Sequence, residues 1–487
     1  MIRDLSRLTA HDFDLLVVGG GVYGLTIAYD GAQRGLSVAL VERGDFGAAT
    51  SFNHLKTIHG GLRYLQSADL GRMRESIRER RAFARMAPRY VAPLPFVMST
   101  SSSLTRNSLA MRAAFALDAL IGFDRNDGVD PARHLPAGRI VSGSKARDLF
   151  DGVATGVVAT CAMWHDYETV QSDRLTLAFA LAAAKHGAEL ANYVEAVAPR
   201  RTAGTRQGHG MRAKDVLTDA EFDIGARIVV NAAGPWTPDV LARAGTAGQW
   251  PLLKAMNLVT SRPAREAAVV APTRGGRALV LLPWQGRTLV GTSESTDARS
   301  PDDQHARRNE MLGFLAEVNE AFPDLLLKPE EVSLVHRGIV PATQVGGRLS
   351  LLQHSRIIDH GTQGMDGWIS VVGVKYTTAR AVAERVVDLV MKKLGRPPVA
   401  SRTATTTLPG AALNDTDPVD PVTHAIRSEM AQTLIDVAVR RTGVGVAAHP
   451  GEAVATEYAN AMQNELGWTG ERKRREVESL TRFYEII

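Results

Sequence analysis

Residues 14–24 read DLLVVGGGVYG, and this stretch decides the fold. The apolar run 14–18 has the length of a buried strand, and the helix-like segment 25–34 follows the glycines. Gly35 ends that segment, and a second apolar run, 37–41, comes next. A strand, a glycine turn, a helix and a second strand within about 30 residues predict the first unit of a dinucleotide-binding fold.

The glycines satisfy the pattern G-x-G-x-x-G, and each has its own physical role. Gly19 permits a tight turn, Gly21 lets the backbone approach a pyrophosphate, and Gly24 allows close packing of helix on strand. The start of the helix offers free N–H groups and a positive dipole end to phosphates. Glu42, at the end of the second apolar run, can accept hydrogen bonds from a ribose diol, and an acid there disfavours a 2′-phosphate.

The segment after Glu42 favours FAD over NAD. A simple NAD-binding unit continues with another helix and strand, whereas residues 44–51 read GDFGAATS and residues 56–64 read KTIHGGLRY. Small residues, hydroxyls and the second glycine pair, Gly60 and Gly61, can lie along an extended dinucleotide and bring backbone close to a flat ring. The sequence therefore predicts FAD as the cofactor and predicts no metal.

Composition sets broad limits on the partners. The chain has 487 residues, 45% hydrophobic and 22% charged, which is ordinary for a globular protein. The formal net charge of +5 suits an anionic substrate or lipid surface, and without a clustered basic patch it predicts no nucleic-acid binding. Cys161 is the single cysteine, so an intrachain disulfide is excluded, which fits a reducing compartment.

No targeting or membrane-spanning segment is expected. Residues 1–14 lack a continuous apolar core, and no stretch reaches the ~20 apolar residues of a spanning helix. Residues 108–122 form an amphipathic pattern interrupted by Arg112 and Asp118, and we expect this helix to pack on the protein itself. The expected location is the cytoplasm, with peripheral contact at the inner face of the membrane as the alternative.

A series of further motifs occurs along nearly the whole chain. In order they are DFGAATS at 45–51, KTIHGGLRY at 56–64, RESIRER at 74–80, WHDY at 164–167, DRL at 173–175, NYVE at 192–195, VNAAGPW at 230–236, VGTS at 290–293 and GVKYTT at 373–378. This ordered set resembles the FAD-dependent glycerol-3-phosphate dehydrogenases of the D-amino-acid-oxidase-like flavoprotein superfamily. Residues 429–476 resemble the helical C-terminal domain of that family.

The resemblance implies an α/β, Rossmann-like FAD-binding domain, an antiparallel β-sheet substrate domain and a helical C-terminal domain. The FAD-binding domain is discontinuous because its motifs lie far apart in the chain. The predicted ranges are 1–95, 145–244 and 341–400 for the FAD-binding domain, 96–144 and 245–340 for the substrate domain, and 408–487 for the C-terminal domain. Helices are predicted at 423–441, 451–466 and 470–484.

The predicted FAD contacts lie in the glycine turns, at strand ends and in residues 44–64, here called the flavin loop. Gly373 precedes a helix at 379–390, and such an N-terminus can stabilise negative charge on a reduced flavin. By the resemblance, the backbone of Val194 holds the adenine. The predicted cofactor-binding residues are Gly19, Gly21, Val22, Tyr23, Gly24, Glu42, Arg43, Thr50, Ser51, Lys56, His59, Gly60, Gly61, Val194, Ala233, Gly234, Trp236, Gly373, Lys375, Tyr376 and Thr377.

The chain departs from the family pattern at the substrate. Asn257 stands where the family carries a histidine, and Val340 stands where the family carries an arginine that reaches the substrate. Arg337 is three residues from Val340, so on a strand it points to the opposite face and is a poor substitute. Gln353 falls at the place of a second arginine. Poor turnover of glycerol 3-phosphate, or a different hydroxylated substrate, is therefore expected.

The resemblance implies oxidation of a CH–OH group by hydride transfer to the flavin, on a small polar or anionic hydroxylated substrate. The predicted catalytic and substrate-binding residues are His59, Arg63, Lys254, Asn257 and Lys375. Because the Asn257 amide cannot take a proton, His59 and Lys375 remain as candidate bases. An amine or amino-acid oxidase and a non-catalytic flavin-binding protein are the alternatives. The electron acceptor (quinone or oxygen) and the oligomeric state stay open.

Overall fold

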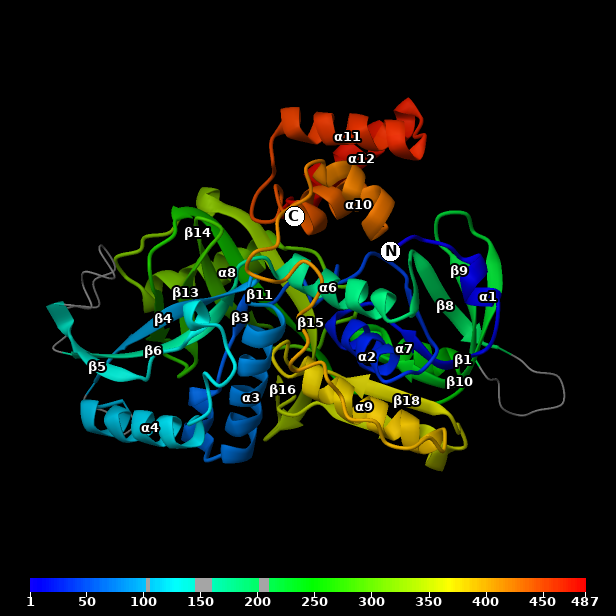
Figure 1. The fold of residues 1–487 in the computed structure, drawn as a ribbon. Coiled ribbons are helices and arrows are strands. Elements are labelled where there is room, and N and C mark those ends of the chain that lie inside the picture. The colour runs from blue at the N-terminus through cyan, green and yellow to red at the C-terminus, as the bar shows by residue number, and fades with distance from the viewer. Residues whose placement is uncertain (102–105, 145–159, 201–209) are drawn as a thin grey trace.

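The structure is a computed structural model that describes residues 1–487 except 102–105, 145–159 and 201–209. Its described part contains two large β-sheets, each with its own helices, and a helical C-terminal segment that lies across one end of both (Figure 1). The predicted FAD-dependent fold class is confirmed: an α/β unit, a largely antiparallel sheet and C-terminal helices.

The first sheet has the strand order β17-β18-β10-β1-β2-β7, with β1, β2, β7, β10 and β18 parallel to their neighbours and β17 antiparallel. β8 and β9 extend β10 as an antiparallel ribbon. The strands are β1 (Phe13–Val18), β2 (Val38–Glu42), β7 (Glu189–Asn192), β8 (Val194–Pro199), β9 (Gly210–Asp215), β10 (Glu221–Asn231), β17 (Arg356–Asp359) and β18 (Trp368–Val372).

Both faces of β1 are covered, which explains why its sequence is apolar throughout. Leu15 and Val17 pack into the layer of α2 (Val22–Gln33), α6 (Ser172–Lys185) and α9 (Ala379–Lys393). Leu16 and Val18 pack on the opposite face, with residues of α1 (Ser6–Thr9), α7 (Thr237–Arg243) and the β8–β9 ribbon. This period of two fixes the register of β1.

The second sheet has the order β16-β15-β11-β14-β13-β12-β4-β6-β3, with β5 beside β6, and is antiparallel except where β12 meets β4. Its strands are β3 (Thr57–Ile58), β4 (Val91–Ser99), β5 (Arg139–Ser142), β6 (Thr160–Thr169), β11 (Leu252–Pro263), β12 (Ala268–Pro272), β13 (Ala278–Trp284), β14 (Arg287–Glu294), β15 (Val332–Val345) and β16 (Arg348–Leu351). The predicted antiparallel sheet at 245–340 lies at its centre.

Helices α3 (Leu70–Met86), α4 (Ser108–Ile121) and α8 (Arg308–Ala321) accompany this sheet (Figure 1). The short helical turns are η1 (Leu62–Ser67), η2 (Pro131–Arg133), η3 (Gly234–Trp236), η4 (Pro329–Glu331) and η5 (His360–Gln363). Strands β3, β6 and β16 lie in ranges predicted for the FAD-binding domain but belong to this second sheet. The sheet to which a strand belongs depends on its hydrogen-bonded partners, which are distant in the chain. The predicted boundary at residue 145 lies outside the described residues.

The C-terminal segment contains α10 (Pro421–Glu429), the π-helical turn η6 (Asp436–Arg441), α11 (Glu452–Leu466) and α12 (Gly470–Phe483). The prediction of one helix over 423–441 is wrong, because Met430 has a φ of 59°, in the left-handed region, and ends α10. The Asp436 carboxylate accepts hydrogen bonds from the Gln432 and Thr433 N–H groups and starts a new turn. The other two predicted helices agree with α11 and α12 to within one residue at each end.

Asp45 ties this C-terminal segment to the loop after β2. Its fully buried carboxylate accepts hydrogen bonds from Arg440 Nε at 2.6 Å and from the Arg441 nitrogens at 2.7 and 2.8 Å. Burial alone would raise the pKa of Asp45, but the two guanidinium groups outweigh burial and hold the pKa well below its usual range. The carboxylate is therefore charged at neutral pH, and together with Asp436 and Glu429 it neutralises two buried cations.

No helix in the described parts of the chain is long and apolar enough to cross a membrane. The amphipathic pattern at 108–122 forms α4, as predicted, and its Met111 and Phe115 are buried. Leu109 and Leu120 on α4 and Phe123 just beyond it are 76%, 72% and 78% exposed, so α4 packs on the protein with one face only.

Replacing Asp45 by Asn should lower the free energy of unfolding by about 3 kcal/mol, because the buried guanidinium groups of Arg440 and Arg441 lose their shared partner and keep only Asp436 and, at 4.0 Å, Glu429. The loss should be present at neutral pH and should shrink as the pH falls below about 4, where the carboxyl group of the unfolded parent chain is itself protonated. Urea unfolding followed by circular dichroism measures it. Arg427→Met, which breaks the exposed Arg427–Glu465 pair, is the matched control and should change little. Equal midpoints for both variants would contradict the buried anchor.

Candidate active site

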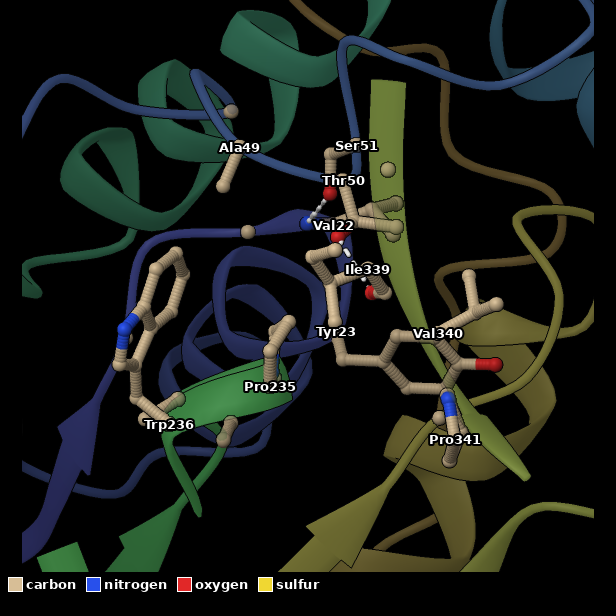
Figure 2. Close-up of a pocket in the computed structure, with 18 of the residues that line it drawn as sticks. Val22, Tyr23, Ala49, Thr50, Ser51, Pro235, Trp236, Ile339, Val340 and Pro341 are labelled. Carbon is tan, nitrogen blue, oxygen red and sulfur yellow. Dashed lines mark hydrogen bonds between the residues drawn. The ribbon is translucent and has the colours of Figure 1, made fainter. Parts of the chain in front are cut away.

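A cavity lies between the two sheets and is lined by residues of both. It opens beside the carboxyl ends of β1, β10 and β18, which is where α/β sheets bind ligands. Figure 2 shows part of the lining, with Thr50, Ser51, Trp236 and Val340 around the space.

The turn between β1 and α2 presents bare backbone to this cavity. Gly19 has a φ of 108°, and a Cβ atom there would lie 2.6 Å from Ala232 O. A Cβ on Gly24 would lie 1.8 Å from Gly19 O, so strand and helix are in direct contact. Gly21 caps α2, and the only contact its Cβ would make is with Ser51 Oγ, at 3.2 Å. Glycines and a helix N-terminus facing open space fit a pyrophosphate.

Glu42 fixes the polar corner next to this turn. One carboxylate oxygen accepts from Gly20 N at 2.6 Å and the other accepts from Gly44 N at 2.8 Å. Burial raises the pKa of Glu42, while these two N–H bonds oppose the shift. Val194 lines the same part of the cavity, and Arg43 stacks 4.0 Å above the Trp236 ring. A carboxylate held by backbone at this corner fits a ribose diol.

The opposite part of the cavity is built by Tyr23 and residues 373–376. A Cβ on Gly373 would lie 2.2 Å from the Tyr23 ring, so only glycine lets this segment pack there. Tyr23 Oη accepts hydrogen bonds from the N–H groups of Val374 and Lys375, both at 3.1 Å, and donates to Lys375 O at 2.7 Å. Tyr23 and Val340 both line the cavity (Figure 2). Tyr376 stacks on the His54 ring with a centroid separation of 4.5 Å.

Three cationic groups surround Tyr64 near this part of the cavity. Lys375 Nζ lies 4.0 Å from the ring centroid, Arg72 Cζ 4.4 Å and Arg63 Cζ 5.4 Å. Burial lowers the pKa of Lys375 to about 7, and the charges of Arg72 and Arg63 add to the shift. Burial and then Arg63 and Lys375 also hold the pKa of His59 well below its usual value, so His59 is neutral at physiological pH.

Asn257 lines the cavity, and both ends of its amide make a hydrogen bond. Its Nδ2 donates to Asn53 O at 3.1 Å, and its Oδ1 accepts from Thr292 Oγ1 at 2.7 Å. It therefore fixes the flavin loop against β14 and has no group that takes a proton. Val340 also lines the cavity and brings no charge to it.

Most of the predicted site residues converge on the cavity. Those that line it are Gly19, Gly21, Val22, Tyr23, Glu42, Arg43, Thr50, Ser51, Val194, Ala233, Gly234, Trp236, Asn257, Gly373, Lys375 and Tyr376. The remaining ones lie behind this lining or beside it: Gly24, Lys56, His59, Gly60, Gly61, Arg63, Lys254 and Thr377.

Several of these outlying residues support the lining instead of forming it. Gly24 is closed off by Gly19, and Lys56 Nζ donates to Phe52 O and, at 3.0 Å, to Ser172 Oγ. Gly60 N donates to Asp166 Oδ1 at 2.7 Å, which pins the second glycine pair. The prediction of direct FAD contact for Lys56 therefore does not match its buried, internally bonded position.

Lys254 is not placed where the sequence predicted. Its Nζ lies 2.7 Å from Glu310 and 3.3 Å from Asp303, and the side chain is 1% exposed. Lys254 and Asn257 are three residues apart on β11, so they point to opposite faces. The lysine neutralises acids behind the sheet and brings no charge to the cavity.

Arg337 is engaged elsewhere, as its offset from Val340 predicts. Its Nε donates to Gln304 O, NH1 donates to Val335 O at 2.9 Å, and the guanidinium lies over the Phe483 ring.

Two residues at the candidate site were not predicted from the sequence. His54 lines the cavity, and its Nε2 is buried without a hydrogen-bond partner among the described residues. Burial, followed by the charge of Lys56, keeps the pKa of His54 well below its usual value. Arg72 joins the group around Tyr64. His54 lies in the same loop as several predicted residues, and Arg72 lies nine residues after Arg63. Neither position is a specific signal in the sequence.

A dinucleotide-binding sheet, a cavity at the carboxyl ends of its strands and a cationic group around Tyr64 beside that cavity define a flavin-dependent oxidoreductase. The chain belongs to the FAD dependent oxidoreductase family, whose profile matches residues 14–389, and FAD is its cofactor. Residues 419–473 match the C-terminal domain of alpha-glycerophosphate oxidase. The predicted family and cofactor are therefore confirmed.

Relatives of known name agree with this class. A glycerol-3-phosphate dehydrogenase from Synechocystis sp. is 27% identical over 99% of this chain and 98% of its own. The human mitochondrial glycerol-3-phosphate dehydrogenase is 30% identical over 88% of this chain, which spans only 60% of that longer protein. The solved glycerol-3-phosphate dehydrogenase from Bacillus halodurans, complexed with FAD, shares the fold with a TM-score of 0.76 at 22% identity, covering 98% of this chain and 96% of its own.

Replacing Gly21 by Val should lower the FAD content of the purified protein several-fold, because a branched side chain would occupy the space that the pyrophosphate needs. The backbone at Gly21 has a φ of −74°, so valine fits the local conformation and the protein should stay folded. The ratio of flavin to protein absorbance measures occupancy. Gly313→Val on α8, where a Cβ meets nothing within 4 Å, is the control and should keep its flavin. Full occupancy in Gly21→Val would place the pyrophosphate elsewhere.

Proposed function

We propose that the protein oxidises the CH–OH group of a small hydroxylated substrate that carries an anionic group, with glycerol 3-phosphate as the first candidate. The observation that carries the proposal is Lys375, which lies in the cavity wall next to Arg63 and Arg72 around Tyr64. The names of the relatives, glycerol-3-phosphate dehydrogenase in both bacteria and mammals, support the same substrate class.

The charged side chains have two separate roles, binding the anionic group and accepting a proton. Bound FAD supplies a two-electron acceptor. Arg63 and Arg72, both permanently charged, attract and hold the anionic group of the substrate. Lys375, with a pKa of about 7, exists in both forms at neutral pH, so its neutral form can accept the hydroxyl proton. Asn257 holds the loop in place and takes no proton.

The electron acceptor is a quinone or oxygen. A protein of similar fold from Mycoplasma pneumoniae is named an oxidase, whereas the relatives by sequence are named dehydrogenases. We infer a quinone, because the full-length relatives are dehydrogenases. Air-saturated buffer that reoxidises the reduced protein faster than a soluble quinone would contradict this choice.

We place the protein in the cytoplasm, with peripheral contact at the inner face of the membrane. The exposed Leu109, Leu120 and Phe123 at α4 support such a contact. Cosedimentation with anionic phospholipid vesicles tests it, and full recovery in the supernatant at low salt would contradict it.

Anaerobic mixing of the protein with glycerol 3-phosphate should bleach the flavin absorbance, and glycerol at equal concentration should bleach it far more slowly. The reason is that only the phosphorylated substrate engages the charges around Tyr64. Stopped-flow absorbance measures both rates. Bleaching by amino acids or amines, with none by glycerol 3-phosphate, would establish an amine or amino-acid oxidase in its place. No bleaching by any of them would favour a flavin-binding protein without activity.

Replacing Lys375 by Met should slow flavin reduction by about 10²–10⁴-fold, the usual contribution of a general base. In the parent protein kcat/KM, which reports ionisations of the free enzyme and of the free substrate, should rise with pH through about 7 as Lys375 loses its proton. The phosphate monoester of the substrate itself titrates at about 6, and this step should be common to the parent and the variant. The component due to Lys375 should be absent from the pH profile of Lys375→Met. An unchanged profile would remove Lys375 from the proton transfer.

A further inference from the structure

We infer that Arg72 is a specificity-determining residue that, together with Arg63, binds the anionic group of the substrate. It takes over from the family arginine whose position is occupied by Val340 in this chain. The inference deepens the proposed function and rests on it for the identity of the substrate. No motif of the sequence points to Arg72, because it comes from α3, in front of the second sheet, and not from β15.

Arg72 is held in place from two sides. It lies in the first turn of α3, where its backbone N–H donates to the capping carboxylate of Asp69 at 3.0 Å. Its guanidinium lies over the Tyr64 ring, and NH1 donates to Gln353 Oε1 at 2.7 Å. Gln353 is itself fixed by a bond from its Nε2 to Leu351 O. One nitrogen of the guanidinium is thus positioned, and the rest of its donor fork remains for a ligand.

The group around Tyr64 has donors without acceptors. Tyr64 is 3% exposed, and its Oη is buried without a hydrogen-bond partner among the described residues. The same is true of Lys375 Nζ, which lies over the same ring. Buried donors are rarely left unpaired in proteins, and an oxygen-rich anion supplies acceptors for several of them at once.

The acids nearby do not neutralise this group. In the described chain no carboxylate lies within 4.0 Å of a side-chain nitrogen of Arg63, Arg72 or Lys375. Glu75 pairs with Arg385 at 2.8 Å, and Asp69 uses one oxygen for the cap and turns the other to His354 at 3.6 Å. Lys375 Nζ is buried, Arg72 is half-buried and Arg63 is exposed, so the three form a positive patch that runs from the cavity wall to the surface and raises the local concentration of an anion. This arrangement fits a phosphate or a similar tetrahedral anion.

The test compares Arg72→Met with Arg78→Met in the FAD-loaded protein. Arg78 is an exposed arginine on the same helix, so it controls for loss of charge on α3. Two readouts are needed: the Kd of inorganic phosphate by calorimetry, and the kcat and KM for glycerol 3-phosphate. Arg72→Met should raise both Kd and KM by about 10–100-fold with little change in kcat, since it removes binding shared by ground and transition states. Arg78→Met should change neither.

Two further variants separate positioning from charge. Arg72→Lys keeps the charge but not the fork, and Gln353→Leu releases the guanidinium, so each should give a smaller rise in KM. Flavin content and thermal stability equal to those of the parent show that the variants fold. A Kd and KM unchanged in Arg72→Met would overturn the inference, as would failure of the parent protein to bind phosphate. Phosphate binding that depends on Arg72, without reduction by glycerol 3-phosphate, would sustain the anion site and overturn only the proposed substrate.

Discussion

The close approach of α2 to β1 is the constraint on which the rest of the structure depends. With Gly24 directly against Gly19 O, no side chain fits between helix and strand, so the helix N-terminus is brought to the carboxyl edge of the sheet. Ser51 then accepts from Val22 N, at 2.9 Å, and carries the flavin loop across this edge. The loop in turn meets the second sheet through Thr50 and Ile339 O. One steric condition in the first turn thus aligns both walls of the cavity.

The second determinant is electrostatic and works at the other end of the cavity. Gathering Arg63, Arg72 and Lys375 around one buried ring is unfavourable in the free protein, because the like charges repel one another, most strongly at the buried Lys375 Nζ. The same repulsion, added to burial, brings the pKa of Lys375 to about 7 and keeps His59 neutral. The positive charges that attract an anion therefore also lower the pKa of Lys375, which lets its neutral form act as a base.

Local chemistry made the cofactor end predictable from the sequence. The spacing of Gly19, Gly21 and Gly24, and the acid at Glu42, are demands of backbone geometry and hydrogen bonding within 30 residues, and the structure brings all four together. The substrate end depends on contacts between distant segments. Arg72 meets Gln353 across 281 residues, and no local pattern reveals such a pair.

The errors have the same origin. Lys254 was expected to contact the substrate. Instead it pairs with Asp303 and Glu310, which are distant in sequence, behind the sheet. The end of α10 at Met430 is marked by neither glycine nor proline in the sequence. The helix ends there because hydrogen bonds to Asp436 start the following turn. Helices α11 and α12 were predictable, since each begins and ends with its own local signals.

A crystal structure of the FAD-loaded protein grown with inorganic phosphate tests the central claim, that one cavity holds the dinucleotide at one end and an anion at the other. The expected result is a pyrophosphate at the Gly19–Val22 turn, a flavin ring beside residues 373–376, and a phosphate within hydrogen-bond distance of Arg63 and Arg72. An FAD bound in the reverse direction, or a phosphate bound away from the Tyr64 group, would contradict it.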